Sequence, residues 1–107
     1  MSSQAQAPIP IPIPKSLSKT VTEKPHLFAV TFHNDDYTPM DFVVSLLIRV
    51  FRKDEKTANT IMKEVHDKGS GVAGVYSFDI AVTKKLHADR LSAEKSYPLL
   101  ITISEEA

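Results

Sequence analysis

The chain has 107 residues, with 13 Lys and Arg against 13 Asp and Glu, so its formal net charge is zero. That length fits one domain, and the balanced charge argues against a nucleic-acid binder, which usually gathers basic residues on one face. The absence of cysteine excludes disulfides, thiol nucleophiles and Cys-based metal sites. It also fits a reducing compartment, so we expect a cytoplasmic location. No apolar run reaches the roughly 18–20 residues of a membrane span, so no membrane partner is expected.

Proline dominates the beginning of the chain, where four of the seven prolines alternate with isoleucine from Pro8 to Pro14. Proline removes backbone donors and biases the preceding residue toward extended conformations, so neither a helix nor a central strand is expected there. We predict that residues 1–24 form a disordered or extended N-terminal arm, and that residues 25–107 form the folded domain. The arm has three lysines and one glutamate, whereas the domain has ten basic and twelve acidic residues.

The domain is predicted to begin with a strand, a turn and a helix. Phe28, Val30 and Phe32 alternate as expected for one face of a strand. The Asn-Asp-Asp-Tyr sequence at 34–37 is typical of a turn, because short Asx side chains bond back to the local backbone. A helix should follow, with Thr38 as its N-cap and a proline at its first position.

Four further elements are predicted along the rest of the chain. Asp54 is placed to cap a second helix, which Gly69 ends. Alternating residues over Val72–Val82 predict one long strand, residues 83–94 predict a short polar helix, and residues 99–104 predict a last strand. The order β-α-α-β-α-β indicates an α+β sandwich, in which a three-stranded, mainly antiparallel sheet packs against three helices.

The densest polar cluster is His33-Asn34-Asp35-Asp36, and His66-Asp67 is its expected neighbour in space. Imidazole and carboxylate are ordinary zinc or iron ligands, but neither a His-x-x-x-His nor a His-Glu-x-x-His spacing occurs. A hydrolase would need a nucleophile, and the chain has neither a Gly-x-Ser-x-Gly elbow nor a cysteine. Three scattered glycines do not make a phosphate-binding loop. We therefore expect no catalytic residue, no metal and no cofactor.

The same cluster suits ligand binding better, because acceptor groups at a loop rim stand beside apolar side chains on two helix faces. The acceptors are Asn34, Asp35, Asp36 and His66, and the apolar side chains are Met40, Val43, Met62 and Val65. Such a site fits a ligand that is cationic at one end and apolar at the other. A free peptide α-amine followed by a bulky first side chain has that chemistry. A plain turn beside core methionines is the alternative interpretation.

A resemblance to a known family favours ligand binding over a plain turn beside core methionines. The string from Asn34 to Met40, together with Val65-His66 and Gly74-Val75-Tyr76, resembles the ClpS family of adaptors of the ATP-dependent Clp protease. The likeness extends over roughly residues 26–105. It implies a non-enzymatic adaptor that binds N-degrons, meaning proteins with a free α-amine and a bulky first residue (Leu, Phe, Tyr or Trp), and delivers them for degradation.

The resemblance also implies roles for individual residues. Asn34, Asp35, Asp36 and His66 match the group that binds the α-amine and the first peptide unit. Six others match positions that line or border the first-side-chain pocket: Thr38, Met40, Val43, Met62, Val65 and Leu99. Within this pocket Met40 acts as a gate against β-branched residues.

The expected partner is the N-domain of a ClpA-type or ClpC-type AAA+ unfoldase. The resemblance assigns docking on that domain to Tyr37, Asp79, Ala81 and Lys84. Val82 and Ala73 depart from the family pattern. A divergent paralogue with a shifted first-residue specificity, or a structural module without peptide binding, is therefore the alternative.

Overall fold

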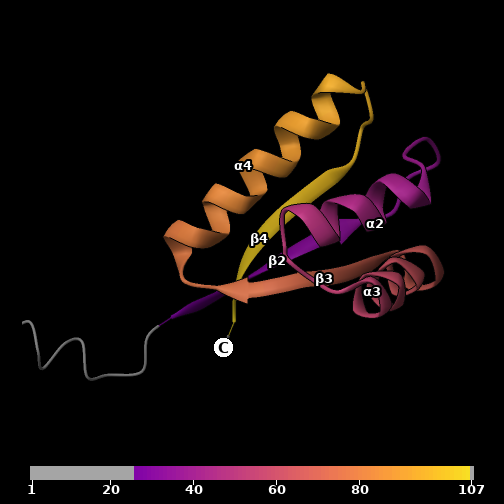
Figure 1. The fold of residues 1–107 in the computed structure, drawn as a ribbon. Coiled ribbons are helices and arrows are strands. Elements are labelled where there is room, and N and C mark those ends of the chain that lie inside the picture. The colour runs from indigo at the N-terminus through magenta and orange to yellow at the C-terminus, as the bar shows by residue number, and fades with distance from the viewer. Residues whose placement is uncertain (1–25, 107) are drawn as a thin grey trace, which may run out of the picture.

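The computed structural model describes residues 26–106, so the arm predicted for residues 1–24 lies outside the described residues. The elements in chain order are β2 (Leu27–His33), α2 (Met40–Arg49), α3 (Glu55–Lys68), β3 (Ser70–Tyr76), α4 (Phe78–Glu94) and β4 (Leu100–Glu106) (Figure 1). This confirms the predicted order of strands and helices.

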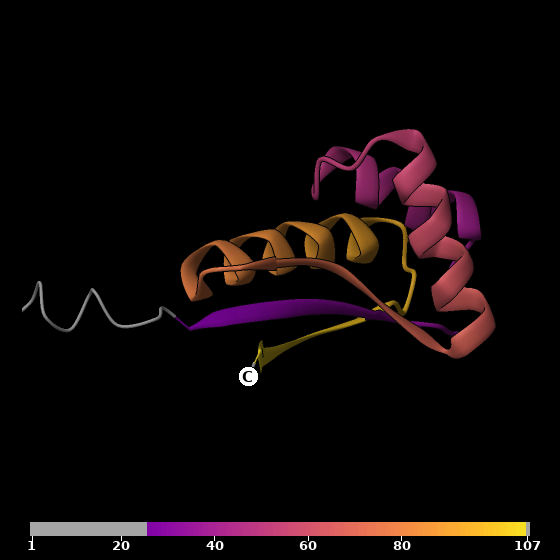
Figure 2. The same cartoon turned by 90° about the horizontal axis from the view of Figure 1, so that it is seen from below.

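The sheet has the strand order β3-β2-β4, and β2 pairs antiparallel with both neighbours. All three helices lie on one side of it (Figure 2). The α+β architecture with a three-stranded antiparallel sheet is therefore confirmed. Because side chains alternate along a strand, Val30 and Phe32 of β2 point toward the helices while Thr31 and His33 point to the opposite face.

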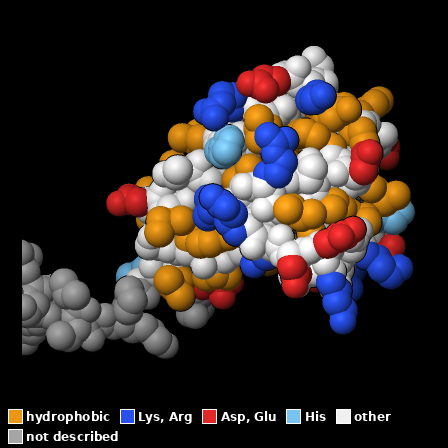
Figure 3. Space-filling view, in the orientation of Figure 1, with side chains coloured by type: hydrophobic (Ala, Val, Ile, Leu, Met, Phe, Trp, Pro, Cys, Tyr) orange, Lys and Arg blue, Asp and Glu red, His pale blue; other side chains and the backbone are white. Residues whose placement is uncertain are grey.

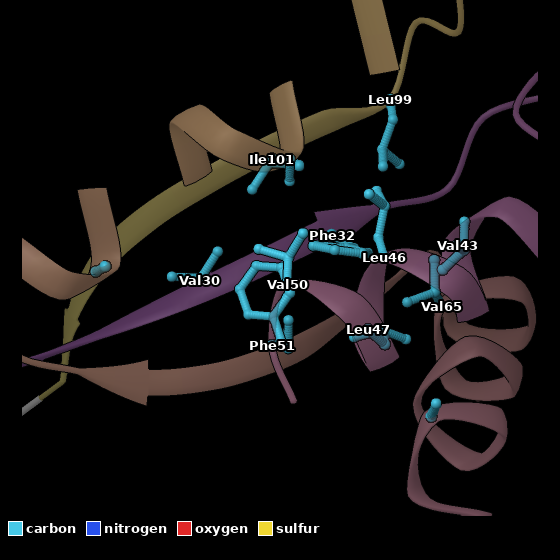
Figure 4. Packing of buried hydrophobic residues seen from close by; sticks show 14 residues of the cluster. Val30, Phe32, Val43, Leu46, Leu47, Val50, Phe51, Val65, Leu99 and Ile101 are labelled. Carbon is cyan, nitrogen blue, oxygen red and sulfur yellow. The ribbon is translucent and has the colours of Figure 1, made fainter. Parts of the chain in front are cut away.

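The core lies between the sheet and the helices (Figure 4). Its largest fully buried side chains are Phe32, Leu46, Leu47, Ile101 and Val30, which come from β2, α2 and β4. The Phe32 ring meets Phe51 edge to face, with 5.3 Å between centroids. Burying one such side chain stabilises the fold by about 1.5–3 kcal/mol, so these residues fix α2 against the sheet.

Both ends of α3 lie where the sequence predicts them, with Asp54 as the N-cap and Gly69 as the C-cap. The Asp54 carboxylate accepts a hydrogen bond from the backbone N–H of Thr57 at 2.9 Å. The side chain and backbone of Thr57 lower the pKa of Asp54 through their hydrogen bonds. Gly69 ends the helix in the left-handed region, with φ 92°, and its N–H donates to the Val65 carbonyl at 3.0 Å.

The long strand predicted over Val72–Val82 is wrong. β3 ends at Tyr76, and Ser77 is the N-cap of α4, where its carbonyl accepts from the Ala81 N–H at 2.9 Å. The helix predicted from residue 83 therefore begins at Phe78 and has 17 residues. Its buried side chains are all small: Ala81, Ala88 and Ser92. No helix in the described part of the chain is long and apolar enough to cross a membrane.

Candidate ligand-binding site

A turn between β2 and α2 is organised by the carboxylate of Asp35. One oxygen accepts from the backbone N–H groups of Tyr37 and Thr38, both at 2.7 Å, and the other accepts from the Thr38 hydroxyl at 2.8 Å. Burial would raise the pKa of Asp35, but the three hydrogen bonds outweigh it, so its pKa lies below the ordinary value of 3.8. The carboxylate is therefore ionised at neutral pH, and its negative charge is fixed beside the start of α2.

The predicted N-cap of α2 is wrong by one residue. Pro39 occupies the cap position, with φ −65° and ψ 145°, and Met40 is the first helical residue. The Thr38 side chain makes no cap bond because its hydroxyl is used by Asp35. The Pro39 carbonyl accepts from Phe42 and Val43 at 3.1 and 3.2 Å, so proline begins the helix without a side-chain cap.

The end of α3 is joined to this turn by the backbone. The Asn34 N–H donates to the Gly69 carbonyl at 2.9 Å, directly after the helix that carries His66. The side chains of Asn34, Asp36 and His66 are exposed. None of the hydrogen bonds between residues 26–106 uses these three side chains, so their polar atoms are open to a ligand.

A narrow cavity of about 10 Å³, open at its mouth, lies between this turn, α2 and α3. It is lined by His33, Asn34, Asp35, Thr38, Met40, Val43, Met62, Val65, His66 and Leu99. Figure 4 shows Val43 of α2 and Val65 of α3 facing each other, with Leu99 just before β4.

The mouth of the cavity continues into an open groove of about 360 Å³. The residues that line both spaces mark where the cavity meets the groove: Asn34, Asp35, Thr38, Met40 and His66. Asp36, Tyr37 and Pro39 line the groove but not the cavity. A ligand could therefore place one apolar group in the cavity and continue along the groove.

The structure thus brings the predicted pocket residues and three of the four predicted amine-binding residues into one cavity, while Asp36 lies in the adjoining groove. Their binding roles stay predictions. His33 also lines the cavity and was not predicted there. Its ring nitrogen Nε2 is hydrogen-bonded to the Thr102 hydroxyl at 2.8 Å, which a linear sequence does not reveal. Within residues 26–106 no three His, Asp or Glu side chains form a metal-binding cluster.

The predicted docking residues do not form one cluster. Tyr37 lies beside the cavity, at the end of β2 where His33 is, whereas Asp79 lies in the first turn of α4. That turn is at the opposite end of β2, because the Phe78 ring packs on Phe28 with 5.1 Å between centroids. Tyr37 is therefore separated from Asp79 by the length of the strand.

Two other docking candidates have clear positions. Ala81 is fully buried, so its side chain supports the surface from beneath and does not itself face a partner. The Lys84 ammonium donates to the Val50 carbonyl at 2.8 Å and lies 5.4 Å from the centre of the Tyr76 ring. Desolvation raises the pKa of Tyr76. Lys84 therefore links α4 to the end of α2, and its side chain is also partly exposed to solvent.

A family model described as "ATP-dependent Clp protease adaptor protein ClpS" matches residues 23–102. The chain belongs to the ClpS family. A ClpS of Deinococcus radiodurans is 45% identical over 93 residues, which cover 87% of this chain and 82% of that relative. A ClpS of Bdellovibrio bacteriovorus is 48% identical over 85 residues, 79% of this chain and 75% of that relative. The predicted family is therefore confirmed.

A solved ClpS structure is also similar. Agrobacterium tumefaciens ClpS2 bound to L-phenylalaninamide superposes with a TM-score of 0.74 at 42% identity, covering 78% of this chain and all of that one. The ligand of that protein has a free amine, a benzyl side chain and a carboxamide. It therefore has the chemistry of the first residue of a peptide.

Proposed function

We propose that this chain is a non-enzymatic adaptor that binds N-degron proteins by their free α-amine and bulky hydrophobic first residue. The observation that carries the proposal is the small apolar cavity with a polar rim, lined by Met40, Val43, Met62, Val65 and Leu99. The L-phenylalaninamide complex of the related ClpS2 supports it, because a phenylalanine side chain and its amine match the two halves of this site.

In this proposal the first side chain of the substrate fills the cavity and its α-amine lies at the rim. Asn34, Asp36 and His66 have polar atoms open to the amine and the first peptide unit, and Asp35 adds negative charge while it shapes the turn. A charge-assisted hydrogen bond contributes about 1.5–3 kcal/mol, and burying Leu or Phe about as much. After the cost of ordering the peptide end, a roughly micromolar affinity is expected.

We also propose that the bound protein is delivered to a Clp AAA+ unfoldase of the ClpA or ClpC type, through a docking surface around Asp79 and Lys84. Asp79 is exposed in the first turn of α4, next to exposed Phe78 and Ile80. Acidic, basic and hydrophobic side chains alternate over the molecular surface in this orientation, so no single sign of charge dominates it (Figure 3). We place this activity in the cytoplasm, with its protease partner.

The test is a panel of peptides that differ only in the first residue, measured by fluorescence anisotropy. We expect Phe, Leu, Tyr and Trp to bind and Ala, Asp and Ile to bind much more weakly. Equal binding of all first residues would reject pocket recognition. A different set of favoured residues would instead support a divergent paralogue with shifted specificity, and no binding at all would support a structural module.

A further inference from the structure

The side of the sheet away from the helices is uncovered in the described part of the chain (Figure 2). Leu27, Ala29 and Thr31 of β2 point to this side. The register places Val75 opposite Ala29 and Val72 opposite Thr31, so these β3 residues share the same side. We call Leu27, Val72 and Val75, with Ala29 between them, the apolar sheet face.

The apolar sheet face is exposed to an unusual degree for aliphatic side chains. Leu27 is 44% exposed, and Val72 and Val75 are each 42% exposed. The solvated side of an antiparallel sheet normally carries polar residues. On the β4 side of the same face Thr102 lies opposite Thr31 and Ser104 lies opposite Ala29, and the exposed apolar side chain is Leu100, opposite His33 at the far end of β2. Beside Ala29 and Thr31 the apolar surface is thus on the β3 side.

β3 is also an edge strand, because the sheet order is β3-β2-β4. Among the described residues only β2 pairs with it, so one row of its backbone groups has no strand partner. A free edge bordered by aliphatic side chains invites pairing with another strand, and natural proteins usually block such edges. Val72 and Val75 therefore mark a place for an additional strand with an apolar side.

The arm has the pattern that such a strand needs. Its bulky aliphatic residues all stand at odd positions: Ile9, Ile11, Ile13, Leu17 and Val21. The even positions from 8 to 22 are proline, serine or threonine. In an extended chain the odd side chains share one face. Because successive N–H groups also point to opposite sides, the prolines at 8–14 remove donors from one edge only, which is how proline occurs in edge strands.

The length of the chain allows this contact. The described structure begins at His26, next to the start of β2, and the end of β3 lies at the same end of the sheet because Phe28 pairs with Tyr76. A strand beside β3 would lie about 10 Å from β2, two strand spacings away. Residues 16–26 extend to roughly 35 Å, more than enough to connect the two.

We propose that residues 9–15 of the same chain, which match the seven residues of β3 in length, pair with the free edge of β3 as an additional edge strand, with Ile9, Ile11 and Ile13 beside Val72 and Val75. The aliphatic side chains of the tract pack laterally against Val72 and Val75, and its outer edge carries the prolines and pairs with no further strand. This contact is independent of the cavity and of peptide binding.

Paramagnetic relaxation in the full-length chain tests the contact. Since the chain has no cysteine, Ser16→Cys gives a single site for a nitroxide label. We expect the amide signals of Val72 and Val75 to be lost through proximity to the label, and those of Val43 and Met62 at the cavity to persist. The matched control adds Ile9→Ser, Ile11→Ser and Ile13→Ser to the labelled chain, which should restore the Val72 and Val75 signals.

Three results would overturn the proposal. Signals of Val72 and Val75 that persist in the labelled chain would show that the tract lies elsewhere. Signal loss that the three Ile→Ser changes do not reverse would show that the aliphatic side chains do not hold it. Equal signal loss in a mixture of labelled chains without isotope and unlabelled isotope-enriched chains would identify a second copy as the occupant.

Discussion

Asp35 and Asp36 are adjacent carboxylates with different surroundings. Asp35 accepts three hydrogen bonds from Tyr37 and Thr38, which hold the turn before α2. Asp36 is exposed and lines the groove beside the cavity mouth. The first carboxylate therefore shapes the site, and the second is free to attract a cationic amine.

The pair gives a matched test. Asp36→Asn should weaken binding of a Phe-first peptide several-fold, because a charged partner of the amine is lost, and should leave the melting temperature unchanged. Asp35→Asn should lower both the peptide affinity and the melting temperature, because one amide oxygen cannot replace the two carboxylate oxygens that hold the turn. Anisotropy and thermal unfolding measure the two effects. Equal loss of thermal stability in both variants would contradict this division.

Met40 stands at the junction of cavity and groove and is 48% exposed. A β-branched first residue carries bulk at Cβ, close to the backbone of the peptide and hence to this junction. Met40→Ala should remove an overlap of about 1–2 kcal/mol and raise the affinity for Ile-first and Val-first peptides roughly tenfold.

Met62→Ala is the matched control, since Met62 is a half-buried methionine of the same cavity that packs against the core. It should weaken binding of every bulky first residue without admitting isoleucine. If Met40→Ala leaves the affinity for Ile-first and Val-first peptides unchanged in anisotropy, Met40 is not a gate.

At the scale of elements, β2 and α3 could be predicted because their signals are local. The alternation of Phe28, Val30 and Phe32 marks the strand, and Asp54 and Gly69 mark the ends of the helix. α4 could not be placed in the same way, because its buried side chains are small while Phe78 and Ile80 are exposed. Because Phe78 and Ile80 lie on the exposed side of α4, the apolar residues at every second position of β3 continue into the sequence of the helix.

Gly69 connects α3 to the binding turn, so its substitution should affect both. Its φ of 92° disfavours any residue with a Cβ, although no atom lies within 4 Å of the Cβ position. Gly69→Ala should cost about 1–2 kcal/mol of unfolding free energy. Because the Gly69 carbonyl accepts from Asn34, peptide affinity should also fall.

Urea unfolding and anisotropy measure these two changes. Lys68→Ala, at the exposed last residue of α3, is the matched control and should change neither. Gly69→Ala with unaltered stability would show that the left-handed conformation is not required.

At the scale of the molecule, the cavity and the proposed docking surface lie at opposite ends of β2. The sequence could predict which residues line the cavity, because Asn34 to Val43 and Met62 to His66 form two short runs. It could not predict that Ala81 is buried or that Lys84 contacts Val50, since both depend on how α4 packs on the rest of the domain.

This separation predicts that docking can be lost without loss of peptide binding. Asp79→Lys should leave the affinity for a Phe-first peptide unchanged and slow the degradation of a Phe-first protein by a reconstituted Clp protease. Asp79 is the better residue to change, because Lys84 also holds the end of α2. A variant that loses both activities, or neither, would contradict two independent surfaces.

Comparing a free with an acetylated peptide shows whether the rim of the cavity recognises a free α-amine. The affinity of a Phe-first peptide is measured by anisotropy beside that of the same peptide with an acetylated N-terminus. Acetylation removes the positive charge and two of the three amine donors but leaves the phenylalanine side chain intact. We predict that the free peptide binds with roughly micromolar affinity and that the acetylated peptide does not bind measurably. Equal affinities would contradict amine recognition.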